Sequence, residues 1–309
     1  VLTVDGFGLE NEALPAIGDN EVLVKTAGCG VCTGDLFVYR QRAELAATPV
    51  RLGHEASGQV LAIGRNVVDV AVGDLVTSLS APAYAENFVA AHDELVKIRP
   101  GVDPMFALGE PIACCVHAAN RFDIAPQDRV AIIGCGFMGL VCQQLAAHQG
   151  AGLICAVDPI VERREMSRQL GADIAYDPET VRAAEILAQH GPFDVVIEAA
   201  GVQSALDLST ELVAEHGRIV LIGYHQSHGG LRAVNMQQWN YKAIDVVNGH
   251  VRRLDEKVDA MRQGMELLQQ GQLITEPLVT IYAFEQIADA FRDLDEQIPG
   301  LFKAVLKMA

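Results

Sequence analysis

The chain is poor in basic and aromatic residues. Its 309 residues include 23 Lys and Arg against 40 Asp and Glu, which gives a formal charge of −17, and a single Trp. Because an acidic surface repels phosphate backbones, nucleic acid is not an expected partner. No basic amphipathic stripe favours a membrane surface. The longest run without charged residues or His, 130–147, is interrupted by glycines and is too short for a membrane-spanning helix.

Cysteine is also scarce for a disulfide scaffold. The seven cysteines are an odd number, and several lie in apolar runs typical of buried segments. No signal-peptide pattern opens the sequence, so we expect the reducing cytosol as the compartment. Half of the residues are apolar, which excludes disorder, and 28 Gly are too few for a fibrous repeat.

Two different patterns of hydrophobic residues divide the chain. The first part carries short apolar runs separated by Gly and Pro, which predicts a β-rich region with few helices. Its predicted strands are 21–25, 59–63, 74–79 and 86–90. From Arg129 onward, apolar strands alternate with helical stretches, which favours a parallel sheet covered on both faces. Here we expect strands at 130–133, 153–157, 194–198, 218–222 and 243–247, with helices at 138–149, 160–170, 179–189 and 204–214.

We therefore predict an α/β protein with two domains. Residues 113–247 form a dinucleotide-binding domain with a doubly wound parallel sheet, the Rossmann arrangement. Residues 1–112 form a β-rich domain. The last part, 248–309, has predicted helices at 256–270 and 284–294 and strands at 278–282 and 302–306, and we expect it to return to the first domain, which would make that domain discontinuous.

A glycine fingerprint follows the strand at 130–133. Gly134-Cys-Gly136-Phe137-Met138-Gly139 is G-x-G-x-x-G at the start of a helix, where backbone N–H groups bind a pyrophosphate. The next strand ends at Asp158, about 20 residues further on, where a carboxylate accepts from ribose hydroxyls and repels a 2′-phosphate. The sequence thus predicts NAD rather than NADP as cofactor, with Arg163 available for the adenosine ribose.

Metal-ligand residue types occur in three stretches. These are Gly30-Val-Cys32-Thr33-Gly-Asp35, Gly53-His54-Glu55 and Gly109-Glu110-Pro111. Cys, His and carboxylate together suit zinc, and three protein ligands with an open fourth position are typical of a catalytic site. Singly, each residue is as easily a core or surface group; the argument rests on their order and flanking residues.

The ordered set of motifs resembles the medium-chain dehydrogenase/reductase superfamily in its zinc-dependent alcohol and polyol branch, which includes sorbitol dehydrogenase. The resemblance covers nearly the whole chain. Besides the stretches above, it includes Gly58, Val72-Gly73-Asp74-x-Val76, Leu170-Gly171-Ala172-Asp173 and Gly217-Arg-Ile-Val-Leu-Ile-Gly223. The resemblance implies that the β-rich part is a GroES-like catalytic domain.

The resemblance also implies roles for the ligand-type residues. Cys32 and His54 would bind zinc, Asp35 would orient His54, and the carboxylate ligand would be Glu55 or Glu110. Neighbouring residues on a strand point to opposite faces, which favours Glu110, whereas the polyol branch favours Glu55. No four-cysteine lobe lies between Val76 and Tyr84, so we expect one zinc per chain and no structural zinc.

The proton path departs from the family pattern. A hydroxyl is common two residues after the Cys ligand, but Gly34 stands there, and Phe37 replaces the His of the usual relay. Water, Thr33, Glu55, Glu110 or Tyr39 remain as alternatives.

Other residues have smaller assigned roles. Small residues after two strands, Ala199–Gly201 and Ile222–Gly223, are predicted to line the nicotinamide half of the cofactor. We expect His225 and His228, in a polar loop at 224–241, to face solvent. Trp239 and Tyr241 would cover an apolar patch or a subunit contact. We interpret Cys29, Cys114, Cys115 and His117 as packing residues rather than ligands.

The predicted function is oxidation of a secondary alcohol or polyol by hydride transfer to NAD at a zinc site. Two alternatives stay open: a zinc-free quinone or enone reductase of the same superfamily, and a catalytically silent NAD-binding subunit. The resemblance implies a homodimer or homotetramer, with the edge strands near 218–222 and 243–247 joined across a two-fold axis.

Overall fold

The computed structural model describes residues 1–45 and 49–308, which divide into two compact units. Unit 1 comprises Val1–Ala113 and Arg253–Ala309, and unit 2 comprises Cys114–Arg252. The boundaries between the units fall after residues 113 and 252. The sequence analysis places them after residues 112 and 247. The assignment of these units as separate domains stays a prediction.

Unit 2 is built on a six-stranded sheet in which every neighbouring pair is parallel. The strand order is β10-β9-β8-β11-β12-β13, so the chain runs outward from β8 to one edge and then from β11 to the other. This reversal defines the doubly wound fold and places its ligand-binding edge at the carboxyl ends of β8 and β11. The strands are β8 (Arg129–Ile133), β9 (Leu153–Val157), β10 (Ile174–Tyr176), β11 (Phe193–Glu198), β12 (Val213–Leu221) and β13 (Asp245–Asn248).

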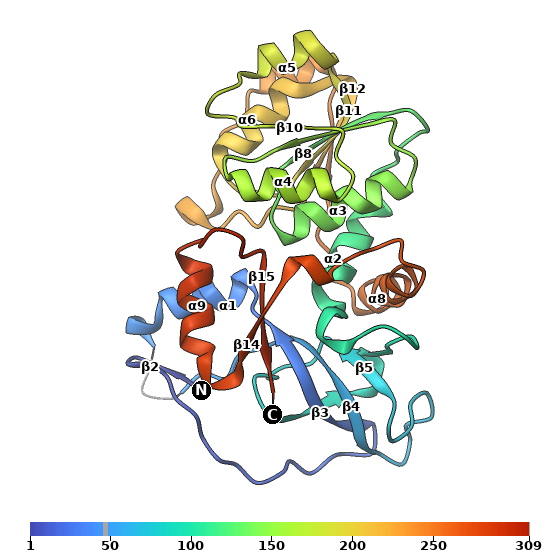
Figure 1. Ribbon diagram of the computed structural model, residues 1–309, viewed down its shortest axis with the longest axis vertical. Helices are drawn as coiled ribbons and strands as arrows, with labels where there is room; N and C mark the ends of the chain where they lie inside the picture. The colour runs from blue at the N-terminus through green and yellow to red at the C-terminus, as the bar shows by residue number, and fades with distance from the viewer. Residues whose placement is uncertain (46–48, 309) are drawn as a thin grey trace. The chain divides into compact units, whose positions relative to one another are not determined.

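Helices cover both faces of this sheet. In Figure 1, α3 and α4 lie on one face, and α5 and α6 lie on the other. The central strand β8 is largely apolar because both faces are covered, and its residues 130–133 are almost entirely buried. The helices of unit 2 are α3 (Phe137–His148), α4 (Val161–Gln169), α5 (Ala183–His190), α6 (Gln203–Leu212) and α7 (Met236–Lys242).

Unit 1 is mainly a seven-stranded sheet that combines both ends of the chain. Its order is β14-β15-β3-β4-β5-β7, with β6 paired to β3. The C-terminal strand β15 runs antiparallel to β3, so the last part of the chain returns to the first part as the sequence predicts. The strands are β3 (Glu21–Gly30), β4 (Glu55–Ile63), β5 (Leu75–Ser78), β6 (Asn87–Ala91), β7 (Leu95–Lys97), β14 (Val279–Ala283) and β15 (Lys303–Lys307); a small separate hairpin pairs β1 (Leu2–Thr3) with β2 (Gly6–Phe7).

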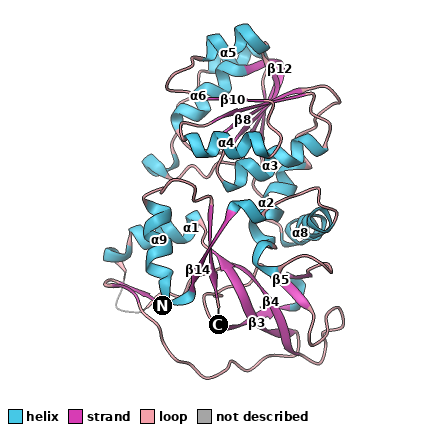
Figure 2. Cartoon of the chain, in the orientation of Figure 1, coloured by secondary structure: helices cyan, strands magenta, loops and turns pink. Residues whose placement is uncertain are grey.

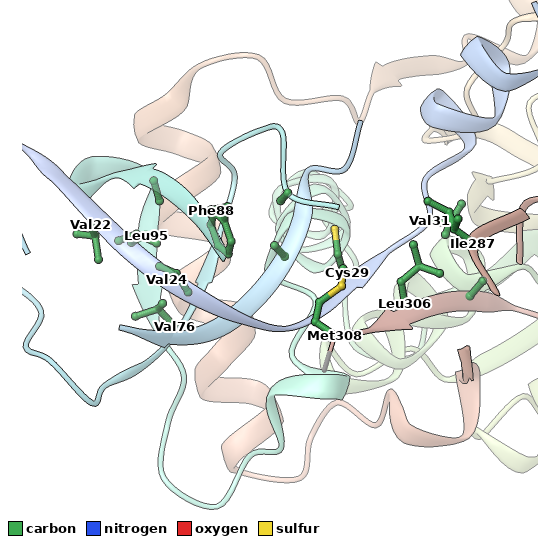
Figure 3. Close-up of a cluster of buried hydrophobic side chains, with 14 of the residues drawn as sticks. Val22, Val24, Cys29, Val31, Val76, Phe88, Leu95, Ile287, Leu306 and Met308 are labelled. Carbon is green, nitrogen blue, oxygen red and sulfur yellow. The ribbon is translucent and has the colours of Figure 1, made fainter. Parts of the chain in front are cut away.

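The core of unit 1 lies between these strands and one helix. Figure 3 shows valines of β3 and β5 packed with Phe88 and Leu95, and Leu306 of β15 beside Ile287. Helix α9 packs against β15 and against α1 (Figure 2). Phe291 of α9 is fully buried and contacts the rings of Phe7 and Tyr84, at centroid distances of 4.6 and 6.1 Å. The helices of unit 1 are α1 (Thr33–Arg40), α8 (Leu254–Gln269) and α9 (Ile287–Asp295), while α2 (Gly109–Ala119) crosses the boundary between the units.

The fold class is confirmed. The short elements that the sequence analysis missed include helix α1, strands β7 and β10 and helix α7, of which α7 lies within the segment predicted as a loop. Each has three to eight residues, too few for a clear hydrophobic period. In residues 1–45 and 49–308, every helix is too short or too polar to span a lipid bilayer.

Candidate metal centre and cofactor site

Strand pairing in unit 1 brings three ligand-type side chains together. Gly30 at the end of β3 pairs with Glu55 at the start of β4. Cys32 lies two residues beyond Gly30, and His54 directly precedes Glu55. As a result, one donor atom each of Cys32, His54 and Glu55 lies within 4.8 Å of the other two. Within the described part of the chain, this is the group of three that could hold a metal ion.

Local backbone geometry explains why His54 and Glu55 reach the same point. β4 begins at Glu55, so His54 lies outside the strand and the alternation of side chains does not apply to this pair. Gly53 before it has φ +95°, and a Cβ there would lie 2.6 Å from the backbone nitrogen of Tyr84. The backbone therefore turns at this point, which is the condition for both side chains to reach one ion. The choice between Glu55 and Glu110 stays a prediction.

Asp35 contacts His54, and Tyr84 in turn contacts Asp35. Asp35 Oδ1 lies 3.4 Å from His54 Nδ1, and the Tyr84 hydroxyl donates to Asp35 Oδ2 at 2.7 Å. Asp35 is almost fully buried in the first turn of α1. This contact fixes the ring so that Nε2 is the nitrogen left for a metal, which is the usual arrangement for a metal-binding histidine.

The surroundings of His54 are strongly anionic. Burial lowers the pKa of His54, but hydrogen bonds with Asp35 and Cys32, together with their negative charges, outweigh burial and raise the pKa to about 11. Cys32 is the N-cap of α1, and its Sγ accepts from the Gly34 N–H at 3.4 Å. The site therefore attracts a cation.

Each of the two candidate carboxylates is paired with a lysine. Glu55 accepts from Lys303 Nζ through both oxygens, at 2.9 and 2.8 Å. Glu110 accepts from Lys257 of α8. Burial raises the pKa of Glu110, but Lys257, His54 and Lys303 lower it more, so Glu110 lies within electrostatic reach of the same centre.

The hydroxyl candidates for the proton path differ in their surroundings. Thr33 is exposed at the start of α1. Tyr39 packs against the rings of Phe7 and Phe291 and lies under the guanidinium of Arg42. Because the Tyr39 ring is held in this aromatic cluster, Thr33 is the more accessible hydroxyl beside Cys32.

In unit 2 the glycine fingerprint forms the turn from β8 into α3. Gly136 is the N-cap of α3, and no side chain caps that helix end. A helix N-terminus of this kind is where backbone N–H groups bind a phosphate. Phe137 and Met138 open the helix. Gly139 is required by close packing, since a Cβ there would lie 1.9 Å from the carbonyl oxygen of Gly134.

Asp158 lies directly after β9, as predicted. It is also buried and hydrogen-bonded to the backbone, which the sequence does not indicate. It is 2 % exposed; one oxygen accepts from the Cys135 N–H at 2.8 Å, and the other accepts from the Ile160 N–H at 2.9 Å. Arg163 lies 3.9 Å from the carboxylate. Asp158 therefore links the fingerprint turn to the start of α4.

Glu198 was missed by the sequence analysis. This fully buried residue ends β11, and its carboxylate accepts from the N–H groups of Ala200 and Gly201, at 3.0 and 2.6 Å. Its backbone carbonyl accepts from the N–H groups of Ile222 and Gly223. Glu198 thus ties together the segments 199–201 and 222–223. Burial raises the pKa of Glu198.

His225 also belongs to this network, and its predicted exposure was wrong. Its Nε2 lies 3.0 Å from Glu198, while Arg232 Nε donates to its Nδ1 at 2.9 Å. Because an arginine nitrogen can only donate, Nδ1 accepts and Nε2 carries the proton toward Glu198. His228, by contrast, is exposed. The signal for Glu198 was present in the sequence: an acidic residue directly after a short apolar run.

The donor set at the metal centre fits zinc. A thiolate, an imidazole and a carboxylate are the ligand types of catalytic zinc sites. The side chain of Glu55 occupies space that only a glycine leaves open, since a Cβ on Gly30 would lie 2.1 Å from Glu55 Oε2. Asp35 supplies the carboxylate that a zinc-binding histidine usually contacts.

Comparisons with known proteins agree with this assignment. Two family models match, described as alcohol dehydrogenase GroES-like domain at residues 18–151 and zinc-binding dehydrogenase at residues 138–270. The chain is 31% identical over 260 residues to L-threonine 3-dehydrogenase of Saccharopolyspora erythraea, covering 72% of this chain and 76% of that protein. It is 29% identical to D-arabitol-phosphate dehydrogenase of Enterococcus avium, covering 68% of this chain and 70% of that one.

Solved structures show the same fold. Galactitol-1-phosphate dehydrogenase from Escherichia coli superimposes with a TM-score of 0.84 at 24% identity, covering 96% of each chain. With the fold, the ligand cluster and the relatives in agreement, the chain belongs to the zinc-type alcohol dehydrogenase family of the medium-chain dehydrogenase/reductase superfamily and is an oxidoreductase of that family.

Proposed function

We propose that this protein oxidises a secondary alcohol or polyol with NAD, at a zinc ion held by Cys32, His54 and Glu55. The observation that carries the proposal is the group of three donor atoms within 4.8 Å of one another, with Asp35 behind the histidine. The relatives named for arabitol phosphate, galactitol 1-phosphate and the 3-hydroxyl of threonine share the oxidation of a hydroxyl group. That shared chemistry supports the substrate class and leaves the individual substrate open.

The protein residues have distinct tasks in this reaction. Cys32, His54 and Glu55 bind the metal, and Asp35 holds the ring of His54 in one orientation. When bound, zinc supplies a Lewis acid for the alcohol oxygen, and NAD supplies the hydride acceptor. Thr33 is the accessible hydroxyl beside Cys32 and takes the alcohol proton toward water. Glu110, paired with Lys257, adds negative charge near the centre without belonging to the group of three.

Residues of unit 2 hold the cofactor. The N–H groups at the start of α3 bind the pyrophosphate, and Asp158 with Arg163 lies where the adenosine ribose is expected. The negative charge of Asp158 disfavours a 2′-phosphate, which supports NAD over NADP. Ala199, Gly201, Ile222 and Gly223 border the nicotinamide, with Glu198 fixing both segments through backbone hydrogen bonds.

The active form is a homodimer joined through β13. This strand forms one edge of the parallel sheet, and Val246 at its centre is 39% exposed. Leu231, Met236 and Tyr241, which precede β13 in the sequence, are also exposed. An apolar edge strand is an aggregation hazard unless another chain covers it. The cytoplasm is the proposed compartment, because all seven cysteines are free thiols.

The proposal is tested by measuring metal content and turnover together. We expect purified protein to contain zinc and to reduce NAD with at least one member of a panel of secondary alcohols and polyols. Cys32→Ser should lose both properties, whereas the matched control Cys155→Ala, which alters a buried thiol in β9, should keep them. Turnover by metal-free protein would reject the zinc mechanism. NAD binding without turnover on the whole panel would favour a silent subunit.

A further inference from the structure

Lys303 is a buried cation next to the proposed metal ligands. It lies on β15, distant in sequence from every ligand, and is 7% exposed. Its ammonium group donates to both oxygens of Glu55, at 2.8 and 2.9 Å, and to the Val31 carbonyl at 3.2 Å. Lysine is almost never buried unless it is paired, so this position serves the carboxylate.

The charges around the centre show what Lys303 contributes. In their ionised forms, Cys32, Glu55 and Glu110 carry three negative charges, and Lys303 with Lys257 carries two positive charges. Lys303 donates to both oxygens of Glu55, at 2.9 and 2.8 Å, so its ammonium group lies in direct contact with one of these three anions.

We propose that Lys303 is a positioning residue that limits how tightly this centre binds its metal. The inference rests on the proposed function, because it takes Glu55 as a metal ligand. The ammonium group holds the Glu55 carboxylate through both oxygens and offsets one negative charge beside the ion. A metal surrounded by anionic ligands loses its attraction for a substrate oxygen. By offsetting one negative charge of the ligands, the buried lysine preserves the attraction of the metal for the substrate oxygen. The same effect lowers the affinity of the protein for the metal.

The test compares variants of Lys303 in the full-length protein. Lys303→Met removes the charge and keeps the chain length. Lys303→Gln removes the charge and retains a hydrogen-bond donor for Glu55, so it covers the case in which Lys303→Met does not fold. Lys303→Arg keeps the charge. Lys307→Met is the matched control, because it removes an exposed lysine from the same strand.

Zinc affinity is measured by competition with a coloured chelator, and the ligand field by the visible spectrum of the cobalt-substituted protein. Removing a unit charge near a divalent ion should tighten zinc binding at least about tenfold in the Met and Gln variants, even with effective solvent screening. We expect Lys303→Arg and Lys307→Met to remain close to the unmodified protein. The cobalt bands should shift in the neutral variants and remain in place with arginine.

The outcomes separate the inference from the proposed function. Unchanged or weaker zinc binding in both neutral variants, with unchanged cobalt bands, would overturn the role of Lys303 even if the thermal stability falls. An unmodified protein that binds no zinc would overturn both the inference and the proposed function. Metal content of the unmodified protein is therefore measured first.

Discussion

Replacing Asp158 should change cofactor preference and stability by two separable mechanisms. Its carboxylate accepts from the N–H groups of Cys135 and Ile160, at 2.8 and 2.9 Å, in a nearly fully buried position. Asp158→Ala leaves both donors unpaired, and at about 1–3 kcal/mol for each we expect the free energy of unfolding to fall by about 2–6 kcal/mol. Asp158→Asn keeps one acceptor oxygen and should lose about half as much.

The electrostatic effect is the same in both variants because both lose the charge. Two unit charges 4 Å apart repel by about 1 kcal/mol in water, so a 2′-phosphate with nearly two charges loses about 2 kcal/mol beside Asp158. Removal of the charge should therefore shift the ratio of kcat/KM for NAD to that for NADP toward NADP by about 30-fold.

The assay measures kcat/KM with each cofactor and thermal unfolding for both variants. Asp177→Ala is the control, because Asp177 pairs with Arg164 near the same strand edge and has no assigned cofactor role. An unmodified protein that prefers NADP, or an Asp158→Asn variant with an unchanged ratio, would refute the role of Asp158 in cofactor selection.

Three further predictions concern the metal centre and the assembly. Asp35→Asn should weaken zinc binding by about 10- to 100-fold, the range for a residue that orients a ligating histidine, as measured by chelator competition; unchanged affinity would contradict the orienting role. Glu55→Gln should weaken zinc binding more than Glu110→Gln, because only Glu55 belongs to the group of three; the opposite order would return the ligand role to Glu110. Val246→Asp should convert a dimer into a monomer in light scattering, since it places a charge on the proposed interface; an unmodified protein that is monomeric at micromolar concentration would count against the dimer.

The sequence predicts the fold well where a pattern extends over many residues. The alternation of strands and helices from Arg129 onward, with the fingerprint at Gly134 to Gly139, specifies the doubly wound sheet. Short elements such as β10 and α7 lack a readable period and were missed. The return of β15 to β3 was expected, although its pairing register cannot be read from a single sequence.

The metal centre could be predicted in its residue types and only partly in its geometry. The choice between Glu55 and Glu110 depends on where β4 begins, and Gly53 ends the preceding segment with positive φ so that His54 lies outside the strand. Long-range partners are harder still. Lys303 is followed by three apolar residues in its strand, but only the fold shows that its partner is Glu55.

Glu198 and His225 illustrate the same limit in unit 2. An acidic residue after the apolar run 195–197 is a recognisable signal, but the segments that it joins are distant in sequence. His225 was expected to face solvent because its neighbours are polar. His225 instead lies beside Glu198, because a buried carboxylate is costly without hydrogen-bond donors.

The central claim, a zinc ion held by Cys32, His54 and Glu55, is tested most directly by counting zinc atoms per chain in the unmodified protein and in Cys32→Ser. The three donor atoms lie within 4.8 Å of one another, and the thiolate is the softest of them. We predict one zinc per chain in the unmodified protein and a loss of that zinc in Cys32→Ser. Full zinc occupancy in folded Cys32→Ser would contradict the account.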